Sequence, residues 1–189
     1  KFGNDDAAGE AFDKIGKIFN LDYPAGPIID KVAKYGDPNA FTFSKPRLEK
    51  YDYSFSGVKT SVLYFIQKEK KKNPEFIKEN IENLAASVQK TIVEILMNKL
   101  EKVAKDYNIS HIAIAGGVSA NSGLREAMTK NEDKLGWNIY IPKFEYTTDN
   151  AAMIAMVAKL KYDRGECTDL SVFATARYAI EESFKKKSE

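Results

Sequence analysis

AIAGGVSAN, residues 113–121, is the stretch of sequence that decides the fold. It begins with small apolar residues typical of a buried strand, turns through two glycines, and leads into a helix that we predict from about 120 to 134. Two glycines at the carboxyl end of a strand let a ligand approach the backbone, and the next helix start offers unpaired N–H groups. A nucleotide-sized ligand and a plain tight turn capped by Ser119 or Asn121 both remain open.

The segments around this stretch predict an α/β fold. The apolar run 111–115 is a strand, 138–142 is a second strand, and 148–162 has the pattern of a second helix. Strands and helices that alternate at this spacing indicate a sheet flanked by helices. We expect a mixed sheet in one compact domain over residues 1–189.

Further helices are predicted upstream, because apolar residues such as Phe12, Ile15 and Phe19 recur at helical spacing. Aromatic and polar residues that alternate on both sides of a proline predict a hairpin. The expected helices cover 5–21, 28–35, 58–70 and 74–107, and the expected hairpin strands cover 41–44 and 51–55.

The composition gives no global reason to bind nucleic acid. Lys and Arg number 29 against 27 Asp and Glu in 189 residues, and 43% of the residues are hydrophobic, enough for a real core. A local cluster of lysines, Lys68 and Lys70–Lys72, is either a solvated helix end or a phosphate contact.

The single histidine and single cysteine exclude several kinds of chemistry. His111 cannot form a histidine pair for zinc, and Cys167 stands alone in the sequence, so neither a zinc protease nor a Cys-His nucleophile is encoded. Cys167 cannot form an internal disulfide, and no apolar run resembles a signal peptide or a membrane span. We therefore expect a cytoplasmic protein without a membrane partner.

Two groups of acidic residues are candidates for a site. One face of the first predicted helix carries Asp6, Glu10 and Asp13. These residues could be general acids or ribose ligands, or they could simply form a solvated face. Asp149 follows the second strand, so it could face the same ligand as Asn121, because strand ends line one crevice in an open α/β sheet. The alternative, which the pattern alone favours, is ordinary helix capping, with Thr148 as the N-cap and Asp149 placed favourably for the helix dipole.

Five motifs together resemble those of the TsaD family, formerly called glycoproteases. One departure is Ala25, where the family usually has a glycine, although Gly26 is in place. The motifs occur in the family's order: DDAAGEAFDK (5–14), LDYPAGP (21–27), FSGVKT (55–60), AGGVSAN (115–121) and TDNAAMIA (148–155).

The resemblance implies an actin-like ATPase (ribonuclease H-like) lobe and a tRNA-modifying acyltransferase. Such an enzyme moves the threonylcarbamoyl group from threonylcarbamoyl-AMP to N6 of the adenosine beside the tRNA anticodon. By motif matching, Asp13, Gly26 and Asn121 would contact the nucleotide, with Asp30 a further ribose ligand. Asp149 would be one ligand of an iron or zinc ion, which acts as a Lewis acid on the carbamoyl group.

The family's metal histidines and its Ser-Gly-Gly-His loop have no counterpart here, since the chain holds only His111. We therefore expect the chain to be the C-terminal lobe of a longer protein, without the N-terminal lobe. Alone, it should be inactive and should hold a metal weakly or not at all. We also expect the isolated chain to self-associate. The alternative is a non-catalytic module that binds nucleotide or the companion proteins TsaB and TsaE. Metalloprotease activity is disfavoured because neither a metal pair nor a nucleophile supports it.

Overall fold

The computed structural model describes residues 6–46 and 51–173. The chain divides into two compact units, one that ends at Thr148 and one that begins at Asp149. The first unit is mostly helical and contains a small parallel sheet. This confirms the α/β class predicted from the sequence.

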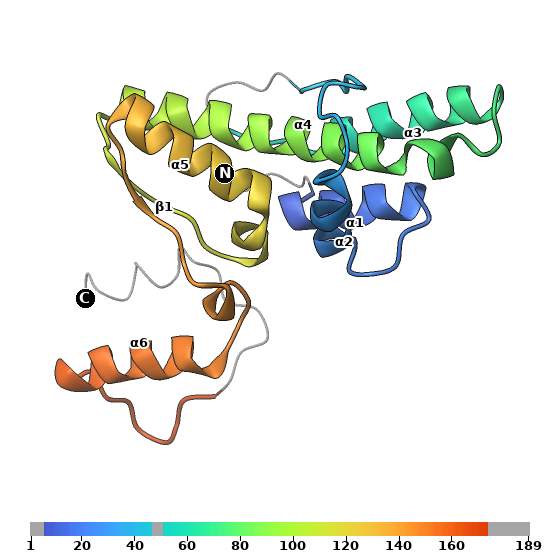
Figure 1. Cartoon of the computed structure of the whole chain (residues 1–189). Coiled ribbons are helices and arrows are strands. Elements are labelled where there is room, and N and C mark those ends of the chain that lie inside the picture. Colours follow the sequence, from blue (N-terminus) through green and yellow to red (C-terminus); the bar gives the residue numbers. More distant parts are fainter. Residues whose placement is uncertain (1–5, 47–50, 174–189) are drawn as a thin grey trace. The chain divides into compact units, whose positions relative to one another are not determined.

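One long helix, α4 (Phe76–Asp106), organises the first unit. Its 31 residues extend over roughly 46 Å at the usual rise of an α-helix. Side chains such as Leu84 and Ile92 belong to one hydrophobic core, whereas Val93 and Met97 belong to another. Figure 1 shows α1, α2 and α3 along one half of α4 and α5 along the other.

The first core is formed by α1 (Ala8–Ile18), α2 (Ala25–Ala33), α3 (Ser56–Lys70) and the first half of α4. Helix α1 and helix α2 approach closely, because a Cβ on Gly16 would lie 2.1 Å from the Cβ of Ala25. Fully buried apolar side chains fill the space between these helices: Ile15, Ile29, Val58, Val62, Leu84, Val88 and Ile92.

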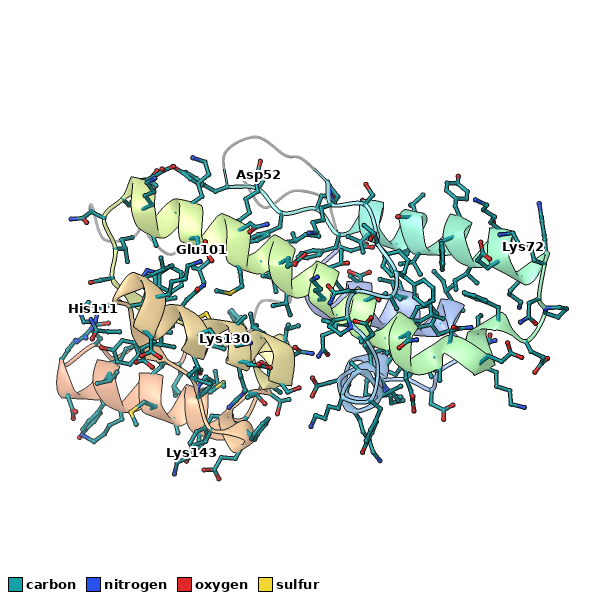
Figure 2. The ribbon with its side chains drawn as sticks, turned by 45° about the horizontal axis from the view of Figure 1, so that its top comes forward. Asp52, Lys72, Glu101, His111, Lys130 and Lys143 are labelled. Carbon is teal, nitrogen blue, oxygen red and sulfur yellow. The ribbon has the colours of Figure 1, made fainter. Side chains whose placement is uncertain are left out.

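The second core lies between the second half of α4, the sheet and α5 (Ser122–Leu135). Strands β1 (His111–Ala113) and β2 (Asn138–Tyr140) pair in parallel, with Ile112 opposite Ile139. Glu101 of α4 and Lys130 of α5 mark where these helices run side by side in Figure 2. There, Asn131 Nδ2 donates a hydrogen bond to Glu101 Oε1 at 2.8 Å.

Most predicted elements are confirmed, with ends that differ by at most three residues. The largest change of interpretation concerns α2, which begins at Ala25 rather than at 28. Proline is tolerated in the first turn of a helix, so Pro27 does not prevent the earlier start. The second unit contains α6 (Ala151–Asp163), whose N-cap is Asn150.

The predicted hairpin of 41–44 and 51–55 is wrong, since neither described segment is a strand. Phe43 and Phe55 are instead buried in the first core as irregular chain. The backbone N–H groups of this region use side chains as acceptors: Phe41 N donates to Ser87 Oγ at 3.1 Å, and Ser44 N donates to Ser61 Oγ at 3.1 Å. Aromatic alternation therefore reflects burial here and not strand pairing.

The expected mixed sheet is also not found among the described residues, where β1 and β2 form a parallel pair. Each strand is followed by a helical segment, namely η1 (Gly117–Ala120) with α5 after β1, and η2 (Phe144–Tyr146) after β2. Across the two described ranges, no helix has both the length and the apolar character needed to cross a membrane.

We predict that Gly36→Ala destabilises the first unit strongly. A Cβ at Gly36 would lie 2.1 Å from the backbone oxygen of Glu82 on α4, so the helix or the loop must shift. The expected loss in the free energy of unfolding, measured by urea denaturation, is roughly 3 kcal/mol. Gly136→Ala is the matched control: it meets no atom within 4 Å, and its positive φ costs only about 1 to 2 kcal/mol. Equal losses for the two variants would contradict this packing.

Candidate functional site

A cleft of about 770 Å³ opens in the first unit where the two cores meet. One wall consists of the starts of α1 and α2, and the other of the loop from Ala115 through η1 to Asn121. Thr147, Thr148 and Phe144 also line it. The cleft therefore collects segments that are far apart in the sequence.

The loop from Ala115 to Asn121, called the glycine loop below, gives the cleft a wall of open backbone. Gly116 has φ +80°, a conformation that favours glycine, and a Cβ on Gly116 or Gly117 would meet nothing within 4 Å. The first residues of α1 and α2 also line the cleft, and helix N-termini carry a partial positive charge. This combination suits a ligand with an anionic group, such as a nucleotide.

Asp13 lies in the cleft wall and also holds the fold together. Its Oδ1 accepts a hydrogen bond from the backbone N–H of Ala25 at 2.8 Å, so a side chain of α1 caps the start of α2. A carboxylate accepts several hydrogen bonds, so this capping bond leaves acceptor capacity for ligand hydroxyls.

The other acidic residues of the predicted stripe have a different role. The ammonium of Lys14 pairs with Asp6 and with Glu10. The pKa of Lys14 is raised, chiefly because of its hydrogen bond to Asp6 and then that to Glu10. The solvated-face interpretation thus fits Glu10, whereas Asp6 is a largely covered partner of Lys14 and Asp13 turns toward α2.

Asp30 connects α2 with the start of α5. Its Oδ1 accepts hydrogen bonds from Ser122 N at 2.9 Å and from Ser122 Oγ at 2.6 Å. Asp30 also lines the cleft. The sequence nominated Asp30 as a ribose ligand but gave no sign of its bonds to Ser122, which is 92 residues away.

Asn121 is the N-cap of α5 and lines the same cleft. Its Oδ1 accepts from Leu124 N at 3.0 Å, and its Nδ2 donates to Gln89 Oε1 at 2.8 Å. A side-chain amide has two donor hydrogens and two acceptor lone pairs, so one of each remains for a ligand. The capping interpretation and the ligand interpretation are therefore compatible at this residue.

Gly26 is the second residue of α2 and lines the cleft opposite the glycine loop. A Cβ there would lie 3.8 Å from the Cβ of Phe12, which is ordinary contact. Protein packing therefore does not require glycine here. The backbone does favour it, because a Cβ on the residue before Pro27 would disfavour the helical conformation.

Asp149 is the first residue of the second unit, directly after the cleft residue Thr148. Asn150, and not Thr148, caps α6, since its Oδ1 accepts from Met153 N at 3.2 Å. The proximity of Asp149 to Asn121 and Asp13 stays a prediction. Within the ranges that the structure describes, no three His, Cys, Asp or Glu side chains gather as a metal ion would require.

Arg125 does not line the cleft itself but packs against Phe144, which does, and sequence reasoning missed this residue. Its guanidinium donates to Ser119 O and to Pro142 O, each at 2.7 Å, and lies 4.1 Å from the ring centre of Phe144. It thereby ties the glycine loop to the segment after β2 and holds an aromatic ring at the cleft. An arginine one turn into a helix resembles any surface arginine in sequence, so no pattern could have revealed this role.

These features define an α/β protein with a cleft lined by the glycine loop and by the starts of two helices. The chain matches the model of the TsaD family, tRNA N6-adenosine threonylcarbamoyltransferase, over residues 2–156, and it belongs to this family. It is 77% identical over 176 residues to a protein of that name from Riemerella anatipestifer, covering 93% of this chain and 52% of the relative.

More distant relatives carry the same name. The protein from Christiangramia forsetii is 55% identical over 174 residues, with 92% of this chain and 51% of the relative covered. The protein from Thermosipho africanus is 48% identical over 180 residues, with 93% and 52% covered. The chain thus spans about half the length of the curated relatives it matches.

We predict that Asp13→Ala lowers the free energy of unfolding by about 1 kcal/mol, because α2 loses its capping acceptor. Asp13→Asn retains an acceptor oxygen and should lose less. The exposed Asp22, which lies outside both helices, is the matched control, and Asp22→Ala should change stability by less than about 0.5 kcal/mol. Thermal and urea unfolding measure all three variants, and an unchanged Asp13→Ala would contradict the capping role.

Proposed function

We propose that the cleft binds the nucleotide part of threonylcarbamoyl-AMP in a protein that transfers the threonylcarbamoyl group to N6 of the adenosine beside the tRNA anticodon. One observation carries this proposal beyond the family match: all four residues nominated from the motifs line one cleft. They come from α1, α2 and the start of α5, and are Asp13, Gly26, Asp30 and Asn121.

Each residue has a role that its chemistry supports. Asp13 and Asp30 accept hydrogen bonds from ribose hydroxyls, and Asn121 offers one donor and one acceptor to the nucleotide. Gly26 and the glycine loop allow close approach of the phosphate to the backbone, where the helix starts favour negative charge. In this proposal the chain thus binds and orients the nucleotide part of the donor substrate, threonylcarbamoyl-AMP.

A metal ion is a further part of the proposal. Asp149 would contribute one carboxylate to an iron or zinc ion, but stable binding needs several fixed ligands. The described residues do not supply such a set, so we propose that this chain by itself holds a metal weakly.

Family membership supports further proposals about the architecture, location and partners of the whole protein. We propose a single actin-like C-terminal lobe over 1–189 in a cytoplasmic protein, with tRNA, TsaB and TsaE as partners of the whole protein. Self-association of the isolated chain is proposed as well, and light scattering at rising concentration tests it.

Nucleotide binding in the cleft can be tested with Gly117→Leu. Gly117 lines the cleft and a Cβ there meets no protein atom within 4 Å, so we expect a leucine side chain to fit without disturbing the fold and to take up cleft volume. We expect the Kd for AMP, measured by isothermal titration calorimetry, to rise at least roughly tenfold. Lys31→Leu, an exposed position of α2 outside the cleft, should leave the Kd unchanged. Equal affinity in Gly117→Leu and the wild type would place the nucleotide elsewhere.

Catalysis by the isolated chain is a separate prediction. With threonylcarbamoyl-AMP and unmodified tRNA, the chain should form no modified adenosine, because it covers about half of its relatives' length and offers one metal carboxylate. Nucleoside analysis by mass spectrometry after tRNA digestion measures the product. The full-length relative from Riemerella anatipestifer, assayed alongside, is the positive control. Product formed by this chain alone would contradict the prediction.

A further inference from the structure

We infer that Gln89 is a positioning residue that fixes the Asn121 amide for the nucleotide, an inference that rests on the proposed function. Gln89 lies on α4, is only 9% exposed, and is not one of the cleft-lining residues. Its Oε1 accepts the hydrogen bond from Asn121 Nδ2 at 2.8 Å. Gln89 therefore reaches the cleft indirectly, through its hydrogen bond with Asn121.

The direction of these hydrogen bonds fixes the orientation of the Asn121 amide. The backbone N–H of Leu124 can only donate, so the side-chain atom of Asn121 that faces it must be the oxygen, Oδ1. The nitrogen Nδ2 then faces α4 and needs an acceptor, which Gln89 provides. Asn121 is 8% exposed, so loss of this acceptor would leave a nearly buried donor unsatisfied.

Gly123 provides the space that this arrangement needs. A Cβ on Gly123 would lie 2.9 Å from Gln89 Nε2 and 3.3 Å from Gln89 Cγ. Alanine normally stabilises a helix relative to glycine. At this position it would instead push the Gln89 side chain out of its place beside Asn121, so glycine preserves the contact between α4 and the start of α5.

A simple role of Gln89 in stability makes a different prediction from a positioning role. Gln89→Met keeps the volume and removes the acceptor, so it should bind AMP roughly tenfold more weakly. Its melting temperature should also fall, because one nearly buried donor of Asn121 loses its acceptor, but by less than that of Gln89→Glu. Gln89→Glu keeps an acceptor oxygen but buries a carboxyl group, so it should lower the melting temperature while the Kd for AMP stays within about threefold of the wild type.

The experiment measures AMP affinity by calorimetry and the melting temperature by circular dichroism for wild type, Gln89→Met, Gln89→Glu and Gly123→Ala. Gly123→Ala should weaken AMP binding as Gln89→Met does. Gln67→Met, the same change at an exposed position of α3, is the control and should alter neither quantity.

Opposite ranking of the two Gln89 variants in affinity and in stability supports the inference. Affinity that falls in parallel with stability, or a Gln89→Met variant that binds AMP like the wild type, overturns it and leaves the proposed nucleotide cleft intact. A wild-type chain that does not bind AMP at all overturns the proposed cleft, and the inference with it.

Discussion

The packing of both hydrophobic cores on a single helix is the constraint on which the rest of the first unit depends. Helix α4 contributes Leu84 and Ile92 to the core of α1, α2 and α3, and Val93 and Met97 to the core of the sheet and α5. The cleft lies where these two halves meet, so its width is set by how each half sits on α4. Val118 of the glycine loop packs against both cores, and this packing holds the loop in position between them.

Polar side chains join the two halves at the cleft. Asp30 of α2 receives two hydrogen bonds from Ser122 of α5, and Gln89 of α4 receives one from Asn121. The same residues that a nucleotide would contact therefore also stabilise the fold. This dual use explains why capping and ligand binding could not be separated from the sequence, since both need an oxygen acceptor at the start of a helix.

The helices and the positions of the two strands could be predicted because apolar periodicity reflects burial directly, whereas the parallel pairing replaces the expected mixed sheet. The alternation near Phe43 and Phe55 misled, because these rings fill the core without strand pairing. Motif matching found the cleft residues, yet the contact between Gln89 and Asn121 spans 32 positions and leaves no local pattern. The arrangement of Asp149 relative to the cleft is a tertiary property that no spacing rule defines.

Family membership follows from the match over residues 2–156, while the chain covers about half of its relatives. The central claim is therefore about this half: its cleft is a nucleotide site. A crystal structure of the chain grown with saturating AMP tests it most directly. We predict the nucleotide in the cleft, with polar atoms within about 3.5 Å of Asp13 and Asn121. AMP bound at another surface, or a cleft that stays empty under saturation, would contradict the account.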